Sequence, residues 1–194
     1  MHAFIIRSVW PAVVFLSATT AGAAGPQCQE LDDSTPKQQV RYLQGDRSGL
    51  RPECIVRAIS KLEEEAYIPA AGILTSYLDF RVAKPRARVL DLSRLPWMEE
   101  YPAAHALLFI GLPASDSLVR VIAAASSSDL LRSNAEEVLL MVHRADPAGA
   151  VMALRQKSRS GLDAATSARL FESAIRLSRK CPGDYRSSCE AALN

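Results

Sequence analysis

The sequence predicts an all-α protein built as a short α-solenoid, in which about three to four antiparallel helical hairpins stack on one another. The first observation is a recurring order: an alanine, a leucine four positions later, and a proline that opens another apolar-periodic run. The second is composition, because aromatic residues make up only 6% of the chain while small alanines, which let helices approach closely, recur throughout. The third is that no stretch alternates apolar and polar residues with period two, so no sheet is predicted. The three instances of the order are Ala58, Leu62 and Pro69; Ala104, Leu108 and Pro113; and Ala135, Leu139 and Pro147.

The size, composition and net charge of the chain exclude some classes of protein. The 194 residues suffice for one domain with a core, and 48% hydrophobic against 23% charged residues exclude a disordered chain. The formal net charge is +2, and Arg7 in the leader accounts for one of the basic residues. A chain this close to neutral has no overall attraction for polyanions, so no nucleic-acid partner is predicted.

Residues 1–24 are a predicted signal peptide. Arg7 precedes an apolar run over 9–18, and residues 21–23 are small, as cleavage requires. An uncleaved membrane anchor is the alternative; the run is short for a bilayer and Pro11 interrupts it. We therefore expect export to the periplasm or the cell exterior, without stable membrane insertion after the leader is removed.

Four cysteines in an exported chain predict disulfide bonds. Cys28 and Cys54 lie near the start, and Cys181 and Cys189 near the end. Of the three possible connectivities, sequence proximity favours 28–54 with 181–189, and each bridge is worth about 2–4 kcal/mol by loop entropy. A zinc site is the alternative, which the lack of a Cys-x-x-Cys pair disfavours.

The helices are expected in the following order. Residues 25–51 form an N-terminal segment with one short helix that begins at Thr35-Pro36 and ends before Gly45. The repeat domain covers 52–180, and its first helix begins at Pro52 with a stripe of apolar residues three and four positions apart. Charged residues on the other face of this helix belong in water. The stripe consists of Ile55, Ala58, Ile59, Leu62 and Ala66.

The remaining helices complete the hairpins. Pro69 opens the partner of the first helix, and two apolar stripes so close in sequence hide each other by folding antiparallel. Gly111 and Gly161 are placed to end helices. Residues 181–194 form a tail closed by the second cysteine pair. Further helices are predicted over 102–111, 118–125, 131–142, 147–154 and 163–179.

An irregular segment, 80–101, interrupts the series of predicted helices. Long ordered loops in compact domains are often functional, and an arginine-rich loop beside a tryptophan can anchor an interface. The alternative, which we favour from the sequence, is a connector whose Leu92, Leu95 and Trp97 cover the core. The candidate partner-binding residues of this segment are Arg81, Lys84, Arg86, Arg88 and Trp97.

The stretch 53–154, about half of the chain, resembles HEAT-type repeats. The likeness is strongest over 101–114, which contains Ala-x-x-x-Leu-x-x-Gly followed by proline, and next over 133–140 with Asp146-Pro147. The chain departs from the pattern in its irregular segment and at Arg144, where glycine is usual. The resemblance implies a short right-handed solenoid, a curved scaffold that typically binds other macromolecules, and it implies no reaction.

Candidate catalytic residues are interpreted as ordinary surface groups. His105 and His143 lack a metal-binding partner at helical spacing and are expected at the surface or at helix ends. Adjacent glutamates on a helix diverge by about 100°, so the acidic pairs and runs are predicted to be solvated. Neither a nucleophile motif nor a phosphate-binding glycine loop occurs. These acidic groups are Glu63-Glu64-Glu65, Glu99-Glu100 and Glu136-Glu137.

From the sequence we therefore expect an exported scaffold that binds another macromolecule, a protein, with no catalysis, metal or cofactor of its own. An enzyme of the cell envelope is the first alternative, and it requires His105 or His143 to converge with a glutamate in one pocket. A purely structural envelope component is the second. The sequence does not determine the partner or the oligomeric state.

Overall fold

A computed structural model describes residues 28–82 and 100–194. Within these two ranges all regular secondary structure is helical, without a strand, and the all-α prediction is confirmed. Five short 3₁₀ turns in these ranges join or extend the α-helices: η1 (Cys28–Leu31), η2 (Arg47–Gly49), η3 (Ile68–Ala70), η5 (Leu112–Ala114) and η6 (Gly183–Tyr185). The α-helices are α1 (Pro36–Leu43), α2 (Pro52–Glu64), α3 (Ala71–Thr75), α4 (Pro102–Ile110), α5 (Ser115–Ala123), α6 (Asp129–Val142), α7 (Pro147–Ser158), α8 (Ala164–Lys180) and α9 (Arg186–Ala191).

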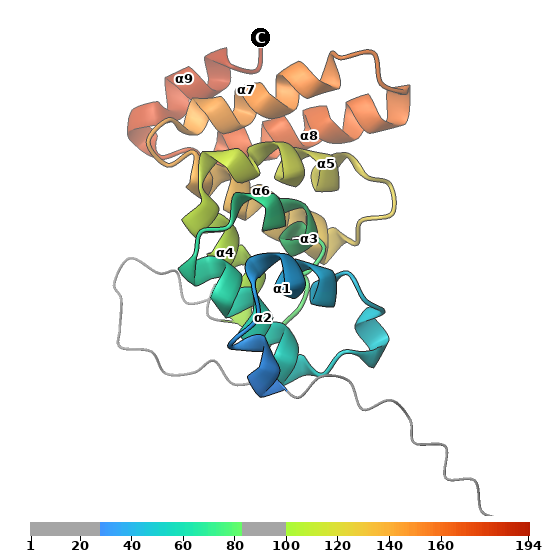
Figure 1. Ribbon diagram of the computed structural model, residues 1–194. Helices are drawn as coiled ribbons and strands as arrows, with labels where there is room; N and C mark the ends of the chain where they lie inside the picture. Colours follow the sequence, from blue (N-terminus) through green and yellow to red (C-terminus); the bar gives the residue numbers. More distant parts are fainter. Residues whose placement is uncertain (1–27, 83–99) are drawn as a thin grey trace, which may run out of the picture.

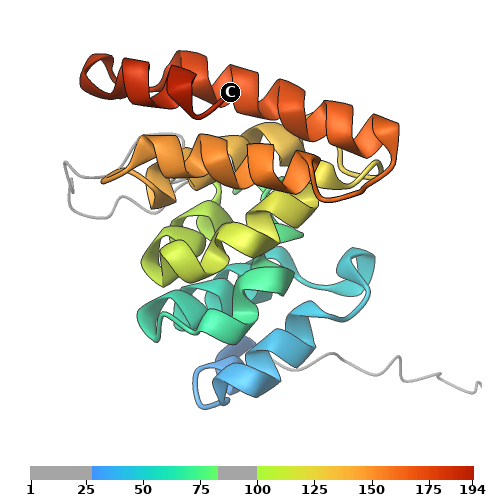
Figure 2. The same ribbon diagram turned by 90° about the horizontal axis from the view of Figure 1, so that it is seen from above.

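The helices pack as two neighbouring rows (Figure 1). In one row α2, α4, α6 and α8 contact each other in this order, and in the other α3, α5, α7 and α9 do the same. The rows face each other through the pairs α3 with α4, α5 with α6, and α7 with α8, while α1 packs on α2. Figure 2 shows the result, with pairs lying one above another in chain order from blue to red.

Prolines start four of the helices, as the sequence predicts. Pro36, Pro52, Pro102 and Pro147 each occupy the first helical position, where the missing N–H has no intrahelical role. Pro69 differs, because it lies within η3 and the following α-helix starts only at Ala71. A 3₁₀ turn with proline therefore precedes α3, and Pro113 has the same place in η5 before α5.

Local chemistry also fixes the other helix ends. Gly111 and Gly161 adopt φ of 74° and 76°, the left-handed region that favours glycine, and end α4 and the turn after α7. Ser128 caps α6 by accepting a hydrogen bond from the Leu131 amide at 3.1 Å. The Asp163 carboxylate caps α8, and its bond from the Thr166 amide lowers the pKa of Asp163.

The core runs the length of both rows. Large, fully buried side chains occur from α1 to α8, and Tyr77, just after α3, donates a hydrogen bond to the Leu43 carbonyl at 2.7 Å. Buried Asn134 likewise donates to the Leu78 carbonyl at 2.6 Å, so α6 is tied to the chain after α3. The large, fully buried side chains include Tyr77, Leu43, Ile55, Ile59, Leu62, Leu74, Leu78, Leu107, Leu118, Ile122, Leu139, Leu154, Leu170 and Leu177.

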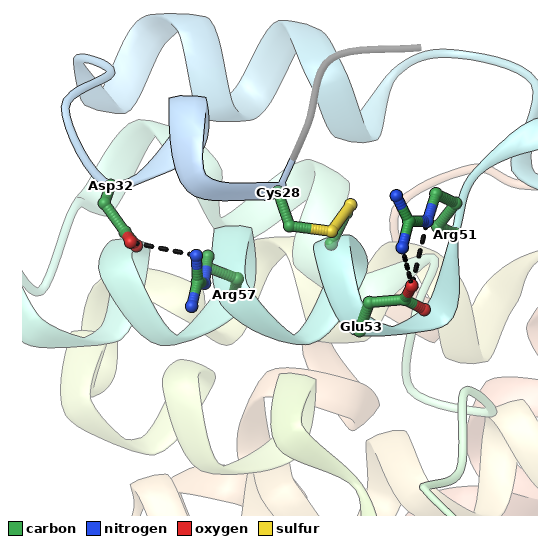
Figure 3. The surroundings of a disulfide bond; sticks show 6 residues. Cys28, Asp32, Arg51, Glu53 and Arg57 are labelled. Carbon is green, nitrogen blue, oxygen red and sulfur yellow. Dashed lines mark hydrogen bonds and ion pairs between the residues drawn. A yellow bond between two sulfur atoms is a disulfide. The ribbon is translucent and has the colours of Figure 1, made fainter. Parts of the chain in front are cut away.

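Both cysteine pairs are those that sequence proximity favours. Cys28 bonds to Cys54 and joins η1 to α2 (Figure 3). Beside this bond, Asp32 forms an ion pair with Arg57 at 2.9 Å, which also connects η1 with α2. Cys181 bonds to Cys189 and joins the end of α8 to α9. Disulfides of this kind fit an oxidising compartment.

The tail after Cys181 contains more structure than the sequence predicts. It forms η6 and α9, and α9 packs against α7 and α8. Arg155 of α7 donates from Nε to the Leu193 carbonyl at 2.8 Å, which fixes the last residues on this helix.

In the described part of the chain, no single helix is long and apolar enough to cross a membrane. The helical segments Pro102–Ile110 and Leu112–Ala123 reach the required length and composition only together, across a bend of 116°.

Candidate functional site

The base of the irregular segment is the described part of the predicted partner-binding site. Arg81 forms an ion pair with Glu100 at 2.7 Å, and the Val82 amide donates to the Glu100 carbonyl at 2.9 Å. These contacts hold together the two ends from which the segment 83–99 departs. Arg81 is 63% exposed at the side chain, so its guanidinium remains open to solvent. Four of the predicted residues lie outside the described ranges: Lys84, Arg86, Arg88 and Trp97.

Arg47 anchors the chain just before this base. Its guanidinium lies over the Tyr77 ring at 4.9 Å and the Phe80 ring at 5.8 Å. It also pairs with Asp79 at 2.8 Å, so Phe80 is fixed immediately before Arg81. Cation–π and ionic contacts thereby give the loop a rigid starting point.

A second cluster joins α2 and α4, and it corrects the sequence-based interpretation. Glu63 Oε1 lies 2.8 Å from His105 Nδ1, and each side chain is only 10% exposed. The prediction that Glu63 and His105 lie at the surface is therefore wrong. Both residues flank the apolar stripe of their helix, so packing α2 against α4 covers them.

The partner of this pair on the solvent side is aromatic. Phe109 lies one turn after His105, with ring centroids 5.0 Å apart, and Phe109 itself is 54% exposed. The cluster is thus a closed contact between helices with an apolar rim. The groove between α3 and α5 is lined by other residues, not by this histidine–glutamate pair.

A third cluster lies where three elements meet. Ser115 begins α5, His143 ends α6, and Asp146 precedes the first residue of α7. Ser115 Oγ and His143 Nε2 are 3.0 Å apart. Burial lowers the pKa of His143, and the neighbouring Asp146 carboxylate opposes this shift. The imidazole is therefore neutral near pH 7, and a neutral imidazole can accept a proton.

Gly149 makes room for this imidazole. A Cβ at position 149 would lie 2.8 Å from His143 Nδ1 and 3.1 Å from Asp146 Oδ2. Contacts below 3.0 Å do not occur for real side chains, so an alanine there would displace the histidine ring. The expectation that His143 lies near a helix end is confirmed, because it is the C-terminal cap of α6.

The fourth cluster ties α6 to α8. Arg176 donates to both carboxylate oxygens of Glu136, at 2.7 and 3.2 Å, and Glu136 is only 3% exposed. This contact raises the pKa of Arg176. The prediction that Glu136 is solvated is wrong, because α8 covers it and supplies the compensating charge. Glu137 is more exposed and pairs with Lys180.

One groove lies between α3 and α5. Its volume is about 280 Å³, at the lower limit for small-molecule sites. Arg120 is exposed there and donates to Ser117 Oγ at 2.9 Å. The lining residues are Gly72, Thr75, Ser117, Arg120, Val121 and Ala124. In the described ranges, three or more histidine, cysteine, aspartate or glutamate residues do not gather in a way that could hold a metal ion.

Comparison with known proteins adds no relative. No protein-family model matches the chain, and neither a curated protein nor a solved structure matches it.

Proposed function

We propose that this protein is an exported HEAT-like scaffold, a short right-handed α-solenoid that binds a protein partner without catalysing a reaction on it. The observation that supports the proposal is the packing order. Each helix from α2 to α7 contacts the helix two positions later in the chain. Each pair then contacts mainly its neighbours, which is typical of stacked helical repeats and of the extended binding surfaces they form.

The two disulfides support the exported part of the proposal. Bridges persist in the periplasm or outside the cell, and both cysteine pairs are bonded here. We therefore propose that the protein is periplasmic or secreted. A reporter fused after residue 24, active only in an oxidising compartment, tests the leader; retention of the fusion in the cytoplasm would contradict export.

We place partner binding on the irregular segment with its base at Arg81. The side chain of Arg81 is exposed at this base. The chain around it is held by the ion pair of Arg47 with Asp79 and by the ion pair of Arg81 itself with Glu100. The other candidate contact residues lie within 83–99 and are predicted from the sequence alone. They are Lys84, Arg86, Arg88 and Trp97. Such a set suits a partner with an acidic surface and a pocket for an aromatic ring.

The experiment begins with the oxidised protein without residues 1–24. A photo-reactive amino acid at position 97 captures the partner from the envelope fraction, and the same group at exposed Lys157 serves as the control site. The captured protein is then purified and its affinity for wild type is measured.

Two charge-matched variants decide the assignment. The first replaces Arg81, Lys84, Arg86 and Arg88 by alanine, and the second replaces four exposed basic residues on other elements. We expect the first variant to weaken binding about thirtyfold or more, equivalent to about 2 kcal/mol, and the second to change it little. Equal affinities of the two variants would overturn the loop assignment. The control residues are Lys37, Arg41, Lys157 and Arg179.

A further inference from the structure

We propose that Ser115 is an activated nucleophile that takes up an acyl group from esters with an apolar acyl chain. The main observation behind this proposal is the 3.0 Å contact between Ser115 Oγ and His143 Nε2. A serine within hydrogen-bond reach of an imidazole, whose other nitrogen lies beside a carboxylate, has the arrangement that nucleophilic acyl transfer needs.

The position of Asp146 decides which nitrogen of His143 carries the proton. A single point, the Cβ position that Gly149 leaves empty, lies 2.8 Å from Nδ1 and 3.1 Å from Asp146 Oδ2. The negative carboxylate on this side favours a proton on Nδ1, which leaves Nε2 as the acceptor. Ser115 is then the donor in its contact with His143, and its proton can pass to the imidazole.

Asp146 is also free to turn toward the ring. It precedes α7 in the N-cap position but makes no side-chain capping bond in the described structure, and it is exposed. Closing the remaining gap to Nδ1 therefore breaks no hydrogen bond of the helix. In that position its charge would stabilise the imidazolium that forms during the reaction.

The surroundings of Ser115 indicate the acyl group. Leu112 is 58% exposed and lies three residues before Ser115, whose amide donates to the Leu112 carbonyl. Side chains three residues apart on a 3₁₀ turn eclipse one another, so Leu112 shares the face of Ser115. Exposed Phe109 belongs to the preceding helix end. An apolar acyl chain can cover part of this exposed surface.

The reaction balances without a further reagent. The Ser115 oxygen attacks the ester carbonyl while His143 Nε2 takes the hydroxyl proton. The C–O bond to the alcohol then breaks, and the imidazolium returns the proton to the leaving alkoxide. The products are an ester on Ser115 and one free alcohol. Because the Ser115 amide already bonds to Leu112, it is not available as an oxyanion donor, and both acylation and hydrolysis of the new ester lack this stabilisation. With an activated ester, whose alcohol leaves more readily than the serine oxygen, we therefore expect stoichiometric acylation rather than fast turnover.

The test uses the full mature protein with p-nitrophenyl acetate and p-nitrophenyl hexanoate as probes. We expect one equivalent of p-nitrophenolate per protein, an acyl group located on Ser115 by peptide mass spectrometry, and faster reaction of the hexanoate. Acylation found only on lysines, or on serines other than Ser115, would overturn the proposal.

Matched variants separate reactivity from folding. Ser115→Ala should abolish the acylation, whereas replacing exposed Ser133 of α6 by alanine should leave it unchanged. His143→Gln should slow the reaction about 100-fold or more, the usual contribution of a general base. Wild-type rates in His143→Gln would show that the serine–histidine contact is only structural.

Gly149→Ala and a pH profile provide readouts that do not depend on removing the histidine. Alanine favours the helix but displaces the imidazole, so acylation should fall while α7 stays folded. In wild type the rate should rise with pH as His143 loses its proton, with a midpoint below the usual histidine value because burial lowers this pKa; Asp146 is the charged group that opposes the shift. An acylation rate that stays constant over the pH range in which His143 loses its proton would contradict the proposal.

Discussion

The two ends of the molecule are closed by the same device, yet they depend on it differently. At the N-terminal end a disulfide joins cysteines 26 residues apart, and at the C-terminal end it joins cysteines 8 residues apart. The longer closed loop removes more conformational freedom from the unfolded chain. The N-terminal bridge should therefore contribute more stability than the C-terminal one.

The two ends also differ in their non-covalent contacts. Besides its bridge, η1 is connected to α2 by the partly exposed pair of Asp32 and Arg57, and such pairs contribute little. This turn is also connected to α1, because Gln39 Nε2 donates a buried hydrogen bond to the Leu31 carbonyl at 3.2 Å. The C-terminal residues, in contrast, are bonded by Arg155 and Arg159 of α7 through two backbone carbonyls. The C-terminal end therefore has two charged donors, whereas the buried donor at the N-terminal end is a neutral amide, so we expect the short C-terminal bridge to supply a smaller share of the stability of its end.

The largest effect is expected from removing the N-terminal bridge. Replacing Cys28 and Cys54 together by alanine should lower the free energy of unfolding by about 3.5 kcal/mol, the loop-entropy value for a separation of 26 residues. Urea unfolding of the oxidised proteins measures this difference. A loss smaller than that of the C-terminal double variant would contradict the comparison.

Removing the C-terminal bridge should cost less. Replacing Cys181 and Cys189 by alanine should lower the free energy of unfolding by about 2.5 kcal/mol, because the loop spans only 8 residues. Hydrogen exchange should show the loss first in α9, while α2 keeps its protection. Uniformly faster exchange across the chain would mean that the bridge supports more than its own end.

Arg155 of α7 holds the last residues of the chain, whereas Arg57 of α2 forms the ion pair at the other end. Arg155→Ala removes the bond to the Leu193 carbonyl and the cation–π contact with Phe171 at 4.6 Å, and should cost about 1.5 kcal/mol. Its control at the other end is Arg57→Ala, for which the loss should stay below about 1 kcal/mol. Thermal and urea unfolding measure both. Equal losses would remove the proposed difference between the ends.

Acidification probes the middle of the molecule, which neither bridge reaches, and should have the smallest effect. Burial lowers the pKa of folded His143, so its contribution is complete above the usual histidine pKa of about 6.5 and is lost as pH falls through the folded value. The free energy of unfolding of wild type minus that of His143→Gln should therefore decrease on acidification. Both double-cysteine variants should keep this pH dependence, and its loss in either would contradict the separation of middle and ends.

Much of the fold is predictable because its signals are local. Pro36, Pro52, Pro102 and Pro147 start helices for a steric reason that needs no neighbour, and Gly111 ends one because it accepts a positive φ. The helix α9 escapes prediction since its six residues are mostly polar and lack an apolar stripe. Its position depends on the bond of Cys189 and on packing against α7.

The candidate sites could be predicted only in part. Segment 80–101 stands out by its broken periodicity, and the structure fixes its base through Arg81 and Glu100. The buried pair of Glu63 and His105 escapes because each residue, on its own helix, looks like a polar group at the edge of an apolar stripe. Their positions beside the stripes are the signal that suggests a contact between stacked helices.

The sequence by itself determined the helical class, the starts of most helices and the cysteine partners favoured by proximity. These features follow from interactions within a few residues, such as helix periodicity, capping and short loop closure. Only the tertiary structure decided that Glu63 meets His105 and that Ser115 meets His143, across 42 and 28 residues. The reason is physical: local periodicity tells which face of a helix is buried, whereas the register between two packed helices depends on all the side chains between them.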